Sequence, residues 1–356
     1  MNAHSPIVAS RAEAAFRKAA AERILVKDGP YGTAIQGLGL TEADYRGTLT
    51  VNHDQKGNND ILNITRPDAI AGIARAYIEA GADILATNSF NANRISQADY
   101  GTEGLVREIN LAAARMLRAE IDAATAKDGR PRFLAGALGP TNKTLSLSPR
   151  VEDPGFREVD FDGVKDVYRE QIDALLDGGA DFILIETVFD TLNAKAAAFA
   201  AMEAEEERGQ RVPIMVSMTL TDLAGRNLSG QTVEAFWVSL EHVRPLSIGL
   251  NCSFGATELR PHVQLLAGMA DALIMVYPNA GLPNAFGGYD EAPETTGGLI
   301  HDWAEQGLLN AVGGCCGTTP AHIKAIAQAV DGLAPRTIPD RPQALRLSGL
   351  EAAVFA

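Results

Sequence analysis

The stretch FDGVKDVYREQIDALLDGGADFILIET, residues 161–187, joins a helix-like segment directly to an apolar strand. In its first part, apolar residues recur every three or four positions, which is the period of one helix face. Gly178 and Gly179 then end the helix, and Asp181 leads into the continuous apolar run FILI. The sequence EAGAD (79–83) repeats this device before a second apolar run, which indicates a fold built from helix–strand units.

Eight apolar runs of this kind alternate with amphipathic segments along the chain. They are ILVKDG (24–29), DILATNSF (83–90), FLAGALGP (133–140), DFILIET (181–187), PIMVSMT (213–219), LSIGLNC (246–252), ALIMVYPN (272–279) and LLNAVGG (308–314). Eight β-then-α units in a chain of this length predict an α/β fold, the (β/α)8 TIM barrel. The alternative is a doubly wound sheet, which usually has fewer strands and a Gly-rich phosphate turn; neither GxGxxG nor GxxxxGK[ST] occurs.

No linker or low-complexity segment divides the chain. We expect residues 23–335 to form the barrel and residues 1–22 to form an N-terminal helical extension without an apolar signal core. Residues 336–356 are expected to be a C-terminal tail, because the Pro-rich stretch APRTIPDRPQ (334–343) follows the last helical segment.

The composition excludes several classes of function. The 356 residues carry a formal net charge of -14 and no basic stripe, so nucleic acid is not an expected partner. No apolar run approaches the ~20 residues that cross a bilayer, so no membrane association is expected. Three cysteines cannot all pair within one chain, and no secretory signal precedes them, which predicts reduced thiols and a cytoplasmic protein.

Polar residues gather at the ends of the predicted strands. In a barrel these ends face one mouth, where catalytic residues come from several strands. The residues in question are Asp28, Gly29, Thr87, Asn88, Gly139, Pro140, Glu186, Thr187, Thr219, Asn251, Cys252, Asn279, Cys315 and Cys316.

The three cysteines are the candidate metal ligands. Cys252 ends the sixth predicted strand, and Cys315 with Cys316 ends the eighth, inside VGGCCGTTP (312–320). Neighbouring residues of a strand point to opposite faces, so both can reach one ion only if the glycines around them let the backbone bend. The alternative is three buried core cysteines. Three thiolates form a soft site with one open position, which predicts zinc with a substrate as the fourth ligand.

The ligand type also indicates a class of reaction. Three thiolates leave the zinc centre electron-rich, so a bound substrate thiol is deprotonated yet still nucleophilic. A site of three histidines would suit water activation better, so we expect alkyl transfer to a thiol. Asn279 ends the strand between the two ligand-bearing strands, and its amide oxygen could fill the open position before substrate arrives; the alternative is a turn residue in YPNAG.

Two acidic residues at strand ends are the candidates for binding an amino acid. Asp28 and Glu186 each end an apolar run, so each needs a partner, and the ammonium of a zwitterionic amino acid would provide one. For Glu186 the alternative is a structural hydrogen bond. The turn KDGPYGT (27–33), which includes Gly29, could donate backbone N–H groups to the carboxylate of the amino acid. Weaker candidates for the same pocket are Thr87, Asn88 and Ser89.

Several motifs resemble those of a known family. They are KGNND (56–60), EAGADILATNSFNANRISQADY (79–100), GALGPTN (136–142), LIETVFDTLNAKAA (184–197), LSGQTVEAF (228–236), GLNCSFG (249–255), YPNAGLPNAFGGYDE (277–291) and VGGCCGTTPAHI (312–323). With these motifs the chain resembles the homocysteine S-methyltransferase family from about residue 24 to 350. NAGLPNAFG and ETVFDTLNAKAA are most similar to the cobalamin-dependent branch, the N-terminal homocysteine-binding module of cobalamin-dependent methionine synthase.

The resemblance implies a reaction and its participants. Cys252, Cys315 and Cys316 would bind the catalytic zinc, while L-homocysteine would ligate the zinc through sulfur and accept a methyl group to give L-methionine. Asp28 and Glu186 match positions that bind the amino-acid end. The implied donor is methylcob(III)alamin on a partner cobalamin/folate-binding subunit or module of methionine synthase, fed by 5-methyltetrahydrofolate.

The chain departs from the family pattern in two places. The usual turn DGAMGT is DGPYGT here, so Pro30 lacks a backbone donor and the carboxylate contacts do not carry over in detail. The chain ends about where the homocysteine module ends, as a split subunit or a fragment would.

Two alternative functions stay open. One alternative is a stand-alone enzyme that uses a small donor, S-methylmethionine or betaine. The other is a non-catalytic subunit that binds homocysteine or zinc.

Overall fold

Eight parallel strands form a barrel in the computed structural model of the protein, which describes residues 7–355. The hydrogen-bonded order is β1-β8-β7-β6-β5-β4-β3-β2, and a parallel bridge between Lys27 and Ile84 joins the two end strands. The expected (β/α)8 fold is therefore confirmed. The strands are β1 (Leu25–Val26), β2 (Ile84–Ala86), β3 (Phe133–Leu138), β4 (Phe182–Val188), β5 (Ile214–Met218), β6 (Ser247–Gly255), β7 (Leu273–Asn279) and β8 (Ala311–Val312).

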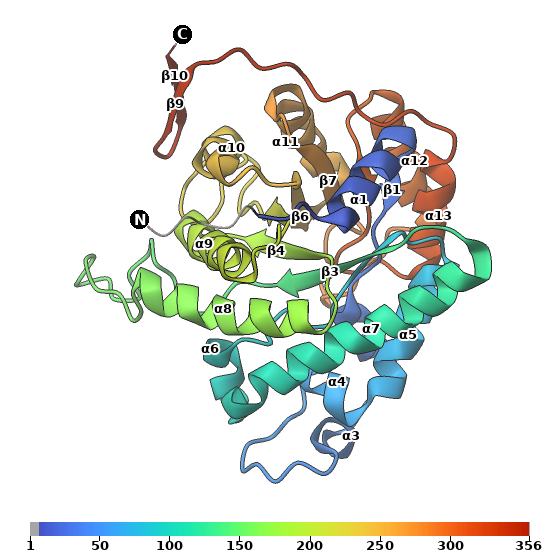
Figure 1. Ribbon diagram of the computed structural model, residues 1–356, viewed down its shortest axis with the longest axis vertical. Helices are drawn as coiled ribbons and strands as arrows, with labels where there is room; N and C mark the ends of the chain where they lie inside the picture. Colours follow the sequence, from blue (N-terminus) through green and yellow to red (C-terminus); the bar gives the residue numbers. More distant parts are fainter. Residues whose placement is uncertain (1–6, 356) are drawn as a thin grey trace.

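A helix follows each strand and packs on the outside of the barrel (Figure 1). The eight helices are α5 (Pro67–Glu79), α7 (Val106–Asp128), α8 (Phe161–Asp177), α9 (Thr191–Arg208), α10 (Val233–Leu240), α11 (Ala256–Met269), α12 (Pro293–Glu305) and α13 (Pro320–Val330). Shorter helical pieces lie in the connections: α2 (Tyr31–Gly37), α3 (Glu42–Arg46), η1 (Asn59–Ile61), α4 (Leu62–Thr65), α6 (Arg94–Gln97), η2 (Ala98–Tyr100), η3 (Glu103–Leu105) and η4 (Glu241–Val243).

The helix–strand junctions form as the repeated glycine motif predicts. Helix α8 ends at Asp177 and the next residue, Gly178, caps it. Gly179 and Gly81 have φ angles of 100° and 108°, which side chains rarely adopt, so glycine at these positions turns the chain sharply into β4 and β2. At the start of α8, the side chain of Asp160 accepts a hydrogen bond from the backbone N–H of Gly163.

The N-terminal segment closes the bottom of the barrel. Helix α1 (Arg11–Glu22) was expected as an extension, and its buried face carries Phe16, Ala19 and Ala20. The ring of Phe16 lies 5.1 Å from that of Phe133 and 5.2 Å from that of Phe182, at the starts of β3 and β4. Helix α1 therefore belongs to the core of the barrel. The catalytic mouth lies at the opposite ends of the strands.

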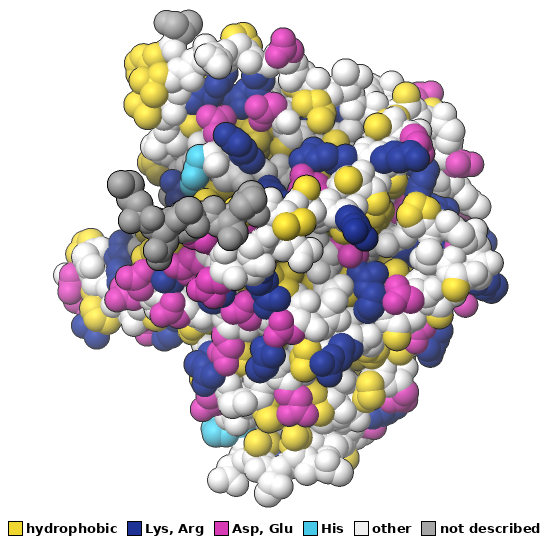
Figure 2. Space-filling view, viewed as in Figure 1, with side chains coloured by type: hydrophobic (Ala, Val, Ile, Leu, Met, Phe, Trp, Pro, Cys, Tyr) yellow, Lys and Arg dark blue, Asp and Glu magenta, His cyan; other side chains and the backbone are white. Residues whose placement is uncertain are grey.

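The C-terminal segment crosses the outside of the barrel and ends in a hairpin. Arg336 is buried and donates hydrogen bonds to the carbonyls of Ala267, Ala270 and Ala272. Strands β9 (Leu345–Ser348) and β10 (Ala352–Phe355) then pair antiparallel beside α10. Figure 2 shows hydrophobic side chains gathered at the upper left, over this hairpin. No helix within residues 7–355 combines the length and the apolar character that a membrane span needs.

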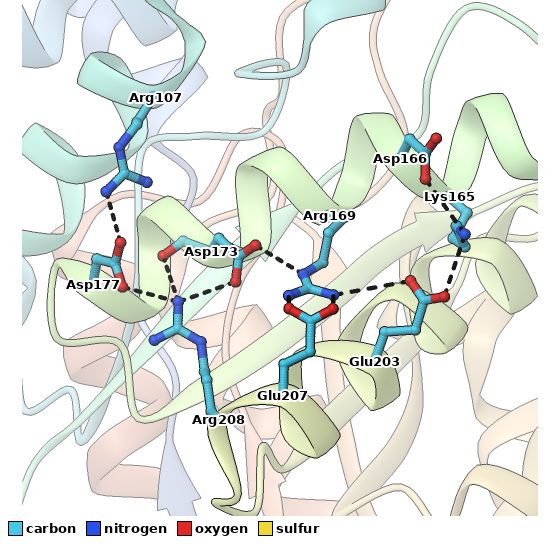
Figure 3. Close-up of polar contacts among 9 residues, drawn as sticks. All are labelled: Arg107, Lys165, Asp166, Arg169, Asp173, Asp177, Glu203, Glu207 and Arg208. Carbon is cyan, nitrogen blue, oxygen red and sulfur yellow. Dashed lines mark hydrogen bonds and ion pairs between the residues drawn. The ribbon is translucent and has the colours of Figure 1, made fainter.

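Ion pairs tie three outer helices together at the surface (Figure 3). Arg107 of α7 pairs with Asp177 of α8 at 2.7 Å, and Arg208 of α9 reaches the same carboxylate at 2.8 Å. Farther along α8, Arg169 pairs with Asp173 at 2.8 Å and also with Glu207 of α9. Exposed pairs contribute at most about 1 kcal/mol each, so this network orients the helices more than it stabilises the fold.

Candidate metal and substrate site

A cavity of about 260 Å³ opens at the C-terminal ends of the strands. The residues that line this cavity come from parts of the sequence as far apart as Lys27 and Cys316, and closure of the barrel brings them together. Seven of the sequence-predicted site residues line it: Gly29, Thr87, Asn88, Glu186, Cys252, Cys315 and Cys316. Asp28, Ser89 and Asn279 are not among the residues that line the cavity.

The three cysteines come together in the wall of this cavity. Their sulfur atoms all lie within 4.8 Å of one another, and the sulfurs of Cys252 and Cys316 are 3.7 Å apart. Zinc–sulfur bonds of about 2.3 Å at tetrahedral angles place two sulfur ligands about 3.8 Å apart. The spacing of these two sulfurs therefore fits a tetrahedral zinc site, and three protein ligands leave the fourth position open.

The backbone around the cysteines is bent as the glycine pattern predicts. Cys252 and Ser253 both have a φ of 61°, an unusual angle outside glycine that turns the end of β6 toward β8. Gly317 has a φ of 79°, and a Cβ atom there would lie 2.3 Å from the ring of Tyr289. Both cysteine-bearing segments thus depend on conformations that extended strands do not provide.

Asn251 connects the metal site to the neighbouring strands. Its side-chain oxygen accepts hydrogen bonds from the backbone N–H of Thr187 at 3.1 Å and from the hydroxyl of Ser217 at 2.6 Å. Its amide nitrogen donates to the hydroxyl of Thr187 at 2.9 Å and contacts the sulfur of Cys315 at 3.8 Å. Asn251 is therefore a positioning residue that fixes β4, β5 and β6 around the sulfurs.

The thiol of Cys316 differs from the other two in its electrostatics. Hydrogen bonds from the side chains of Cys252 and Cys315 hold the pKa of Cys316 well below its usual range. Burial opposes this effect, but it is the smaller influence. The pKa values of Cys252 and Cys315 are raised, so the cluster readily supplies one thiolate, at Cys316, and a metal ion has to displace the protons of the other two thiols.

Asn279 has an unpaired oxygen close to this centre. The residue ends β7, is 1% exposed, and its side-chain oxygen has no hydrogen-bond partner among residues 7–355. A buried acceptor without a donor is costly and calls for an explanation. A metal ion would satisfy it, so the ligand role of Asn279 stays a prediction that fits the structure.

Glu186 reaches the cavity through an irregularity in β4. The pairing of β4 with β5 shifts register between Ile185 and Val188, and bulges of this kind re-aim side chains. One oxygen of Glu186 accepts a hydrogen bond from the hydroxyl of Tyr277 at 3.0 Å. Burial raises the pKa of Glu186, while the positive charge of Lys27 opposes that effect. The other oxygen has no hydrogen bond within the described residues, which leaves it available to a ligand.

Asp28 is engaged within the protein. Its side chain is fully buried; one oxygen pairs with the ammonium of Lys27 at 2.8 Å, and the other accepts from the backbone N–H of Ala86 at 2.9 Å. The Ala86 contact lies at the junction of β1 and β2. The expected contact of Asp28 with substrate stays a prediction, and Lys27 is the member of the pair that lines the cavity.

The polar residues after β2 divide into two groups. Thr87 and Asn88 line the cavity, and the amide of Asn88 also donates to the carbonyl of Asn59 at 2.8 Å. Ser89 is fully buried, and its hydroxyl donates to the carbonyl of Ala137 in β3 at 2.8 Å. Ser89 therefore supports the strand ends, and its expected place in the pocket stays untested.

Sequence reasoning did not single out Lys27, Asp60 or Tyr277 as site residues, although all three line the cavity. A lysine inside the apolar run ILVKDG was the available signal for Lys27, because buried cations need partners. Asp60 lies in KGNND, and burial raises its pKa to about 7. Tyr277 gave no signal beyond its place in an apolar strand.

The family profile described as homocysteine S-methyltransferase matches residues 25–330. The chain therefore belongs to the homocysteine S-methyltransferase family and is a methyltransferase. The oxidized form of the homocysteine methyltransferase MmuM from Escherichia coli superposes with a TM-score of 0.68 at 22% identity, covering 86% of this chain and 95% of MmuM. Its metallated form gives 0.66 at 23%, covering 86% and 96%. At this identity these matches establish the shared fold.

Proposed function

We propose that this member of the homocysteine S-methyltransferase family makes L-methionine from L-homocysteine, with methylcob(III)alamin on a partner protein as the methyl donor. 5-Methyltetrahydrofolate would be the ultimate methyl source. The spacing of 3.7 Å between the sulfurs of Cys252 and Cys316, beside a third sulfur and a cavity, is the observation that carries the proposal.

Cys252, Cys315 and Cys316 would hold the zinc, and Asn279 would supply its oxygen before substrate binds. Bound there, zinc would take the substrate sulfur at the open position and keep it as a thiolate at neutral pH. Asn251 contacts the sulfur of Cys315 and helps to hold it in place. These residues prepare one sulfur for attack on a methyl carbon.

The amino-acid end of homocysteine would lie farther from the sulfurs, near the end of β4. The free oxygen of Glu186 is suited to accept a hydrogen bond from the substrate ammonium, while Tyr277 orients the carboxylate. Thr87 and Asn88 offer further polar contacts from the end of β2. Fixing this end aligns the sulfur for an in-line reaction.

The donor would approach from outside the cavity. Drug-sized ligands occupy cavities of about 300–1,000 Å³, so a space of about 260 Å³ accepts an amino acid and excludes a corrin. The loop after β7 presents Phe286, which is 97% exposed, and Leu282, which is 52% exposed. With Phe90 in the cavity wall and Phe254 at the end of β6, these side chains would supply apolar contacts for a corrin face.

The proposed methyl transfer is a nucleophilic substitution at the methyl carbon. The thiolate sulfur would form a bond to the methyl carbon of the donor, and the electron pair of the broken cobalt–carbon bond would leave with the corrin as cob(I)alamin. The thiol proton leaves to solvent before attack. Small donors, S-methylmethionine or betaine, would fit the same cavity and are the alternative that the test below separates. A subunit that only held zinc would have no need of an open metal position, and one that only bound homocysteine would turn over no donor.

The test is anaerobic conversion of free methylcobalamin to cob(I)alamin by the zinc-loaded protein, followed by absorbance, with L-methionine measured as product. We expect turnover that requires both L-homocysteine and zinc. Parallel reactions with S-methylmethionine and betaine identify a small-donor enzyme. Zinc-loaded protein that binds L-homocysteine but turns over none of the three donors would contradict catalysis by the isolated chain.

A further inference from the structure

Lys27 is the cation of the substrate cavity. Among the described residues that line the cavity, it has the one Lys, Arg or His side chain. The other ionisable lining groups are acids and thiols, including Asp60, Glu186 and the three cysteines. Lys27 is therefore the one lining side chain whose charge attracts the carboxylate of an amino acid.

The contacts of Lys27 leave part of its ammonium unused. The nitrogen lies 2.8 Å from one oxygen of Asp28 and 4.6 Å from the centre of the Tyr277 ring. An ammonium carries three N–H donors. One is satisfied by Asp28 and one faces the aromatic ring, and no acceptor within residues 7–355 receives the third. A carboxylate oxygen in the cavity would supply that acceptor.

The surrounding structure fixes the position of this ammonium. Asp28 is held by the backbone N–H of Ala86, so the carboxylate that anchors Lys27 cannot swing away. The stem of Lys27 packs against β8, where a Cβ atom on Gly313 would lie 2.7 Å from the Cβ of Lys27. Preorganised charges bind ligands well because little side-chain freedom is lost.

The charge of Lys27 persists in this buried position. Burial lowers the pKa of Lys27, but attraction to Asp28 and Glu186 more than offsets burial, and the net effect raises the pKa. The same attraction connects the two ends of the cavity, because Tyr277 lies under Lys27 and donates to Glu186. A cation and an anion thus flank one aromatic ring.

We propose that Lys27 binds the α-carboxylate of the amino-acid substrate, while Glu186 receives its ammonium across the Tyr277 ring. This inference rests on the proposed function. It also accounts for the turn DGPYGT, in which Pro30 has no N–H to offer a carboxylate. Lys27 is thereby a specificity-determining residue that favours a thiol with an α-carboxylate over thiols that lack one.

Titration calorimetry of the zinc-loaded protein with three thiols tests the inference. L-homocysteine carries both groups, 3-aminopropane-1-thiol lacks the carboxylate, and 4-mercaptobutanoate lacks the ammonium. In Lys27→Met we expect Kd to rise about 10- to 100-fold for L-homocysteine and 4-mercaptobutanoate, the range of a charged hydrogen bond. The Kd of 3-aminopropane-1-thiol should change less than about twofold. Lys27→Arg should restore part of the discrimination.

A second variant guards against a misfolded protein. Lys27→Met leaves Asp28 as an unpaired buried charge, which is destabilising. Lys27→Met with Asp28→Asn removes both charges and keeps an oxygen to accept from Ala86, so it should fold, bind one zinc and show the same loss. Equal Kd shifts for all three thiols, or none, would overturn the inference while the proposed function stands. Wild-type protein that binds none of the three thiols refutes both.

Discussion

Replacing Cys316 with alanine should weaken zinc binding about 100-fold. The sulfurs of Cys252 and Cys316 already lie 3.7 Å apart, close to the ~3.8 Å edge of a tetrahedral site, so each ligand contributes with little rearrangement. Structural zinc sites release about 10–16 kcal/mol, which is about 3 kcal/mol for each of four ligands. Loss of about 3 kcal/mol corresponds to the stated factor.

Competition with a chromophoric zinc chelator measures this affinity directly. The sequence contains three cysteines, all in the site, so titration of free thiols reports the same site independently. Zinc-free wild type should expose three reactive thiols, and zinc should protect all three. Phe286→Ala is the matched control, because it alters the exposed rim and keeps every sulfur. Unchanged zinc affinity in folded Cys316→Ala would refute the three-sulfur site.

Three further predictions concern other parts of the molecule. Asp60→Asn should stabilise the protein above pH 7 by at most about 4 kcal/mol, because burial raises the pKa of Asp60 to about 7. Between about pH 4 and pH 7 the native state keeps a proton that the unfolded chain releases, so the stability of the wild-type protein falls as pH rises. Urea unfolding of the wild-type protein and of Asp60→Asn at pH 5 and pH 8 measures this, and the same difference in stability between the two proteins at both pH values would contradict it. Phe16→Ala should cost about 3–5 kcal/mol by leaving a cavity between Phe133 and Phe182, measured by urea unfolding, and a loss below 1 kcal/mol would exclude helix α1 from the core. Phe286→Ala should slow methyl transfer from methylcobalamin while the calorimetric Kd of L-homocysteine stays the same, and an unchanged rate would remove Phe286 from the donor surface.

The sequence predicted the barrel and the metal ligands well because each has a local signature. Eight apolar runs alternate with amphipathic segments, and each contains most of one observed strand. The cysteines stand out because glycines surround them. The strand limits were less accurate: β1 and β8 are only two residues long, because the ladder between them pairs only Leu25 with Ala311 and Val26 with Val312.

The sequence pattern did not show which side chains at the strand ends face the cavity, because this depends on the neighbours of each side chain in the folded barrel. Both faces of a parallel barrel strand are buried, so an apolar run does not reveal which of two adjacent residues faces the cavity. At the end of β1 the sequence singled out Asp28 and did not single out Lys27, although Lys27 lines the cavity; the contact of Asp28 with substrate stays a prediction. After β2, Thr87 lines the cavity, whereas the hydroxyl of Ser89 bonds the hydroxyl of Thr87 and the carbonyl of Ala137; a place for Ser89 in the pocket stays a prediction.

The sequence by itself determined the fold class, the family and the three cysteines of the candidate metal site, because local periodicity and residue chemistry depend on the order of residues in the chain. Only the tertiary structure decided the sulfur spacing, the position of Glu186 and the presence of Lys27 in the cavity. These depend on the register shift in β4, on positive φ angles at Cys252 and Ser253, and on closure of β1 against β2. Register and closure arise from contacts between residues far apart in sequence, which no local pattern encodes.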